Sequence, residues 1–120
     1  MASILIVDDD APIQALLRRI LEEDGHRIRE AANGHIGLML YRDTPTDLVI
    51  TDMLMPERDG MDVTLALTQE FLDARVIALT KATGHYNFPN VAKLFGARRV
   101  IQKPFTSDEI RRVVRLTLEH

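Results

Sequence analysis

Four short apolar runs in this chain each end on a polar residue that suits phosphoryl chemistry. In chain order, these residues are Asp8 with Asp9, Asp52, Thr80, and Lys103 with Pro104. Apolar runs of this length are typical of buried strands in a parallel sheet, which places functional groups at the carboxyl ends of its strands. If the four strands run in one direction, three carboxylates, a hydroxyl and an ammonium group meet at one edge. We expect a site for a divalent cation and a phosphoryl group there.

Each of these residue types fits that chemistry. Carboxylates in one crevice repel each other, and Mg²⁺ relieves the repulsion because it binds few carboxylates together with water and phosphate oxygens. Such an ion also neutralises charge on a phosphoryl group in transfer, which leaves positioning and electrostatics as the main catalytic work. A carboxylate can accept the phosphoryl group covalently. A lysine supplies a point charge that suits a phosphate oxygen.

Each motif also has an ordinary structural explanation when it is taken alone. A run such as Asp8 to Asp10 is usually a solvated turn, and Asp52 could simply end a strand. A lone threonine such as Thr80 is more often structural, and Lys103 could lie on the surface. Because all of them follow strand-like runs in one short chain, the functional interpretation is the stronger one. Asp10 is interpreted as a loop residue or a helix cap.

Strand-like and helix-like segments alternate five times along the chain. The spacing of apolar residues predicts strands over residues 3–8, 26–31, 47–52, 75–80 and 98–102. Capping and breaking residues predict helices over about residues 12–24, 33–44, 60–71, 89–95 and 106–118. Such alternation requires right-handed crossovers and a parallel sheet covered on both faces. We therefore expect one flavodoxin-like, doubly wound α/β domain over residues 1–120, with strand order 2-1-3-4-5 and five helices.

The composition excludes several classes of function. The 15 basic and 18 acidic residues are interspersed, so nucleic acid is not expected as the main partner of this domain. The chain has no cysteine, which excludes disulfides, thiolate metal sites and cysteine nucleophiles. The absence of cysteine fits a reducing cytoplasm, which is the predicted location. No apolar run reaches about 18 residues, so no transmembrane helix is expected. Residues 118–120 resemble the start of a vector-derived tag, so the domain could have been excised from a longer protein.

Four motifs occur in order and with compatible spacing over the whole chain. They are Val7-Asp8-Asp9, the segment from Ile50 to Pro56 with Asp59-Gly60, Ala78-Leu79-Thr80, and Gly96-Ala97 leading to Lys103-Pro104-Phe105. Each motif alone is common, whereas four together are specific. In this combination the chain resembles the receiver domain of bacterial response regulators, which are phosphorylation-dependent switches of two-component signalling.

The resemblance implies a role for each residue of the expected site. Asp52 would be the phosphoryl acceptor, Thr80 would hydrogen-bond the phosphoryl group, and Lys103 would pair with Asp52 and then with the phosphate. The Lys103-Pro104 peptide bond would be cis, as in the family. The residues expected to hold Mg²⁺ are Asp8, Asp9, Asp52 and, through its backbone carbonyl, Leu54.

The resemblance also implies partners. The donor would be a phosphohistidine on a sensor histidine kinase or a phosphotransfer protein. Output would pass through the fourth helix, last strand and last helix to an output domain or downstream protein, and these elements could also form a homodimer. The protein would be a switch and not an enzyme, catalysing only its own modification. The residues expected near the docked donor are Ala11, Pro12, Ala15, Lys103 and Phe105.

Three features depart from the usual family pattern. Val100 replaces the aromatic residue whose ring turns inward on activation, so the readout must differ. Lys81 replaces a small residue beside Thr80, where it could act as a second cation or extend into solvent. Leu54 and Ala82 provide no amide or carboxylate to orient an attacking water. We therefore expect a long-lived phosphorylated form.

Two other functions remain open from the sequence. A haloacid-dehalogenase-type aspartyl phosphatase would use Asp8 as nucleophile and Asp10 as acid and base. Pro12 and the length of 120 residues count against it. A receiver that acts as a protein-interaction module without phosphorylation is compatible with Val100 and Lys81, but the complete set of site residues counts against it. An FMN-binding domain shares the expected fold, but it would need a hydroxyl- and glycine-rich phosphate loop after the first strand. This sequence has no such loop there.

Overall fold

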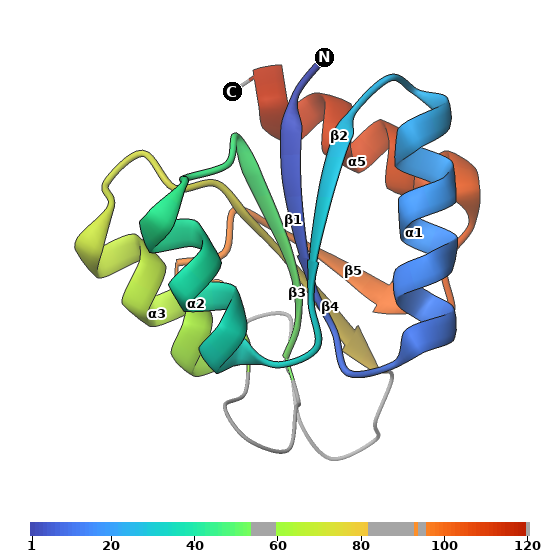
Figure 1. Ribbon diagram of the computed structural model, residues 1–120. Coiled ribbons are helices and arrows are strands. Elements are labelled where there is room, and N and C mark those ends of the chain that lie inside the picture. The colour runs from blue at the N-terminus through green and yellow to red at the C-terminus, as the bar shows by residue number, and fades with distance from the viewer. Residues whose placement is uncertain (54–59, 82–92, 94–95, 120) are drawn as a thin grey trace.

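The computed structural model describes residues 1–53, 60–81, 93 and 96–119, with only the backbone of residues 60, 61 and 81. A parallel sheet lies in the middle of the molecule, with helices on both of its faces (Figure 1). Its strands are β1 (Ser3–Val7), β2 (Arg27–Ala31), β3 (Leu48–Asp52), β4 (Val76–Lys81) and β5 (Arg99–Lys103). The helices are α1 (Ala11–Glu23), α2 (Gly34–Asp43), α3 (Gly60–Glu70) and α5 (Ser107–Glu119).

The strand order is β2-β1-β3-β4-β5, and every pair of neighbours is parallel. This order confirms the prediction of a doubly wound sheet. Helices α1 and α5 cover one face, and α2 and α3 cover the other (Figure 1). The chain reverses direction across the sheet after β2, so the carboxyl ends of β1 and β3 are neighbours. Open α/β sheets bind their ligands in the crevice at this point.

Four helices lie among the described residues, where five were predicted for the whole chain. The missing one, expected over residues 89–95, falls outside the described residues apart from Lys93. The strands near the site also run further than predicted, because the β4–β5 ladder continues to the pair Lys81 and Lys103. Thr80 and Lys103 are therefore strand residues, with backbones held by the sheet. No helix in the described part of the chain is long and apolar enough to cross a membrane.

Local capping sets where three of the helices begin. The Asp10 side chain accepts a hydrogen bond from the backbone N–H of Ile13 (3.3 Å) at the start of α1. Asn33 caps α2 in the same way. Thr106 and Glu109 form the predicted capping box of α5, each side chain accepting from the backbone N–H of the other residue. These bonds satisfy N–H groups that the first turn of a helix leaves without a partner.

The core has two halves, one on each face of the sheet. Along β1, Ile4 and Ile6 belong to the half under α1 and α5, whereas Leu5 and Val7 belong to the half under α2 and α3. All four side chains are at most 1% exposed, and burying a side chain of this size stabilises the fold by about 1.5–3 kcal/mol. β1 pairs along its length with β2 and β3, and this register sets the position of the residues that follow it.

Candidate functional site

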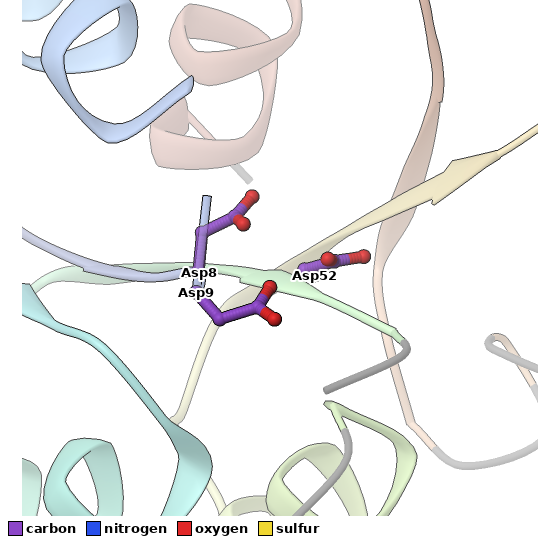
Figure 2. Close-up of side chains that lie close together, drawn as sticks. All are labelled: Asp8, Asp9 and Asp52. Carbon is purple, nitrogen blue, oxygen red and sulfur yellow. The ribbon is translucent and has the colours of Figure 1, made fainter. Parts of the chain in front are cut away.

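Three carboxylates gather at the carboxyl edge of the sheet (Figure 2). Asp8 and Asp9 follow the last residue of β1, and Asp52 is the last residue of β3. One oxygen from each residue lies within 4.8 Å of the others. Asp8 and Asp52 are buried, at 0% and 5% exposure, whereas Asp9 is exposed. The predicted acidic cluster therefore forms, with one ligand open to solvent.

Lys103 brings a positive charge to these carboxylates from β5. Its ammonium nitrogen lies 3.1 Å from Oδ2 of Asp8 and 3.5 Å from Oδ2 of Asp52. The lysine side chain is only 12% exposed, so the ion pairs are shielded from solvent. Three carboxylates so close together repel one another, and the repulsion is strongest between the two buried ones, Asp8 and Asp52. A divalent cation would relieve this repulsion, and an all-oxygen donor set suits Mg²⁺.

The Asp8 carboxylate is held on both of its oxygens. Oδ2 accepts from the Lys103 ammonium, and Oδ1 accepts from the backbone N–H of Asp10 at 2.9 Å. Asp10 itself caps α1, which confirms its interpretation as a helix cap and places its side chain on the helix rather than on the acidic cluster. Asp8 is therefore a fixed member of the site.

Thr80 is buried in β4 with its hydroxyl unsatisfied. The side chain is 2% exposed, and within the described residues Oγ1 has no hydrogen-bond partner. The β3–β4 register pairs Asp52 with Leu79, so Thr80 lies one residue further toward the carboxyl edge. A buried hydroxyl without a partner costs free energy, and such groups gather where a ligand later supplies the bond.

Four other residues were singled out in the sequence: Leu54, Lys81, Ala82 and Val100. Leu54, expected to contribute a backbone carbonyl to the metal, lies outside the described residues, as does Ala82. The backbone of Lys81 pairs with Lys103 in the β4–β5 register. Val100 is partly buried against the small cluster of Met53, Ala78 and Ala97. The Lys103–Pro104 peptide is cis, as the resemblance implied.

The structure adds one residue that the sequence reasoning missed. The Gln14 side-chain amide donates to the backbone carbonyls of Asp8 (2.7 Å) and Ala31 (2.8 Å). It lies three residues before buried Leu17 and therefore on the same face of α1. A polar residue on the apolar face of a helix was the available signal, but the sequence does not say what it contacts.

A five-stranded parallel sheet with polar groups at its strand-order reversal defines a doubly wound α/β domain of the flavodoxin-like class. The family model of the response regulator receiver domain matches residues 4–115. The chain therefore belongs to the family of response regulator receiver domains, which act in two-component signalling.

Individual relatives agree with this assignment. Sporulation initiation phosphotransferase F of Bacillus subtilis is 36% identical, over 93% of this chain and 90% of the relative. Chemotaxis protein CheY of the same organism is 34% identical, over 96% of each chain. The crystal structure of a putative response regulator from Chloroflexus aurantiacus superposes with a TM-score of 0.93 at 28% identity, covering 99% of this chain and 98% of that one.

Proposed function

We propose that this domain is a phosphorylation-dependent switch that accepts a phosphoryl group on Asp52 from a phosphohistidine. The observation that carries the proposal is the placement of Asp52 beside Asp8, Asp9 and Lys103 at the reversal of strand order. In the proposed step, an Asp52 oxygen forms a bond to phosphorus as the phosphorus–nitrogen bond to the donor imidazole breaks. The electron pair of that bond stays on the imidazole nitrogen. The domain catalyses its own modification and turns over no other substrate.

The proposed cofactor is Mg²⁺, held by Asp8, Asp9 and Asp52. The chemistry of the cluster supports this choice, because three carboxylates gather within 4.8 Å of one another and two of them are buried. When bound, Mg²⁺ would neutralise charge on the phosphoryl oxygens during transfer. The backbone carbonyl of Leu54 is proposed as a further ligand on the basis of the family resemblance alone.

Lys103 and Thr80 would hold the phosphoryl group after transfer. The Lys103 ammonium already lies within 3.5 Å of the acceptor, so it needs little movement to meet an oxygen on phosphorus. The Thr80 hydroxyl has a proton to donate and no partner for it in the described part of the chain. Both groups would therefore bind the phosphorylated state better than the unmodified one, and only such differential binding can shift a conformational equilibrium.

The proposed donor docks over the start of α1, beside the acidic edge. Ala11, Pro12 and Ala15 are exposed there, and Phe105 is partly buried after β5. The small side chains leave room for a helix that presents a histidine to Asp52. Such a helix would belong to a sensor histidine kinase or a phosphotransfer protein.

Output is proposed to pass through the surface of β5 and α5. A groove of about 480 Å³ lies there, and the side chains around it include Arg99, Val100, Arg112 and Val113. A downstream protein, an output domain or a second copy of the chain could bind this surface. Val100 provides no ring to move, so we propose that coupling to Asp52 uses the packing of Val100 against the cluster of Met53, Ala78 and Ala97.

The test is an intact-mass measurement after incubation with Mg²⁺ and acetyl phosphate, beside an Asp52→Asn variant. One added phosphoryl group in the parent and none in the variant supports the proposal. An adduct on both proteins would place the acceptor elsewhere. If neither protein gains mass while the parent binds Mg²⁺, the result favours an interaction module that works without phosphorylation, or a pocket blocked by Lys81.

A further inference from the structure

Gln14 joins three segments at the acidic edge through one side chain. Its Nε2 donates to the carbonyl oxygen of Asp8 at 2.7 Å and to that of Ala31 at 2.8 Å. Both amide hydrogens are thereby used, since a primary amide has two. The Ala31 carbonyl also accepts from the backbone N–H of Asp8 at 3.1 Å. The first turn of α1 is therefore tied to the ends of both β1 and β2.

Among the three carboxylates of the cluster, that of Asp9 is the one not held in place by other side chains of the described residues. Its carboxylate forms no hydrogen bond or ion pair with any described residue, and it is exposed. The other two carboxylates are buried in the sheet, and Lys103 contacts both of them. The direction of the Asp9 side chain therefore depends on the two peptide units that flank it.

Both of those peptide units are fixed by side chains. The carbonyl that precedes Asp9 belongs to Asp8 and accepts from Gln14. The N–H that follows Asp9 belongs to Asp10 and donates to Oδ1 of Asp8. Gln14 holds the first of these units and Asp8 holds the second. If the Gln14 amide is lost, the Asp8 carbonyl loses this hydrogen bond and the Asp8–Asp9 peptide is less restrained. More of the ordering of Asp9 then falls to the binding of the cation.

We propose that Gln14 is a positioning residue that preorganises Asp9 for a divalent cation. The inference rests on the proposed function, because it concerns the same cation site. Groups that orient metal ligands typically contribute 10–100-fold to affinity, since a fixed ligand has less freedom to lose on binding. The contribution of Gln14 would be of this kind, made through the backbone rather than through contact with the ion.

The test compares Gln14→Met with a matched control, Thr46→Val. Methionine has a similar length and no N–H group, so both hydrogen bonds are lost while the side chain still fills space. Thr46 donates a buried hydrogen bond to the backbone carbonyl of Leu48 at the opposite edge of the sheet, 2.9 Å away. The control therefore also removes a hydrogen bond from a side chain to a carbonyl, but far from the acidic cluster.

Two readouts that need no phosphorylation are measured on the parent and both variants. Isothermal titration with MgCl₂ gives the Mg²⁺ affinity, and backbone amide NMR without metal reports the environment of Asp9. In Gln14→Met we expect Mg²⁺ affinity to fall about tenfold and the Asp9 amide signal to shift. In Thr46→Val both should stay as in the parent. If Gln14→Met fails to fold, Gln14→Asn, which keeps the amide but is too short to reach both carbonyls, should show the same changes.

The outcomes separate this inference from the proposed function. If the parent does not bind Mg²⁺, both are wrong. If the parent binds and the folded Gln14 variant binds equally well, only the positioning role is overturned. It is also overturned if Thr46→Val loses as much affinity as Gln14→Met, because the loss then reflects stability in general.

Discussion

The ammonium of Lys103 lies closer to Asp8 (3.1 Å) than to Asp52 (3.5 Å). In the unmodified domain, the lysine thus pairs first with the carboxylate that is fully buried and second with the proposed acceptor. Lys103 lies 95 positions after Asp8 in the chain. Lys103 ends β5 and Asp8 follows β1, and these two strands are not neighbours in the sheet order β2-β1-β3-β4-β5. The pair therefore ties β5 to β1 across the carboxyl edge.

Removing the lysine should expose how much the buried carboxylates depend on it. We expect Lys103→Met to lower the free energy of unfolding by about 3 kcal/mol in EDTA, because a buried ion pair loses one partner. Urea denaturation measures this value. In the double variant Lys103→Met with Asp8→Asn, part of the lost free energy of unfolding should be recovered, because the unpaired buried charge is then removed. A double variant as unstable as the sum of both single variants would argue against this pairing.

The unsatisfied hydroxyl of Thr80 predicts that removing it will stabilise the unmodified domain. Thr80→Val removes a buried group that has no partner in the described part of the chain, so the unmodified domain should become more stable by about 1 kcal/mol. Thr80→Ser, which keeps the hydroxyl, should show no gain. Thermal unfolding of the three proteins without Mg²⁺ provides the comparison. A loss of stability in Thr80→Val would mean that the hydroxyl already has a partner.

Gly37 is required by the close approach of α2 to β1. A Cβ atom built on Gly37 would lie 2.8 Å from Cγ2 of Val7, the residue before Asp8. Alanine favours a helix over glycine by about 1 kcal/mol, but overpacking a core costs about 1–3 kcal/mol. We therefore expect Gly37→Ala to lower the free energy of unfolding, as measured by urea denaturation. With Val7→Ala in the same protein, the added methyl group has room, so the double variant should lose less than the sum of the single variants.

Asp47, at the opposite edge of the sheet from the acidic cluster, should make the free energy of unfolding depend on pH in the acid range. The hydrogen bond from the Ser3 backbone N–H, at 2.8 Å, lowers the pKa of the Asp47 carboxyl below its ordinary value. The folded state is therefore favoured above the ordinary pKa of an aspartate, and this contribution is lost as pH falls through the lowered pKa. Because Asp47 is exposed, the effect should be below about 1 kcal/mol. In urea denaturation over the acid range, Asp47→Asn should flatten the pH dependence, and an unchanged slope would contradict the assignment.

Local patterns of residue type were enough to predict the strands, most of the helices and the edge of the sheet at which the site forms. Apolar runs and caps such as Asn33 and Thr106 act over a few residues, so strands and helix starts could be predicted without knowledge of the fold. Asp8, Asp9 and Asp52 were placed together because parallel strands end at one edge. The end of β4 was predicted one residue too early, at Thr80, whereas the strand ends at Lys81. The pairing of Lys81 with Lys103 depends on a neighbouring strand and leaves no local signal.

The contacts that give the site its properties could not be predicted from these patterns and are seen in the folded structure. It shows Lys103 nearer to Asp8 than to Asp52, leaves the Thr80 hydroxyl without a described partner, and joins Gln14 to Asp8 and Ala31. Each of these facts depends on distances between atoms of different elements, often far apart in the chain. Such distances follow from how helices and strands pack, and residue type and spacing do not encode them locally.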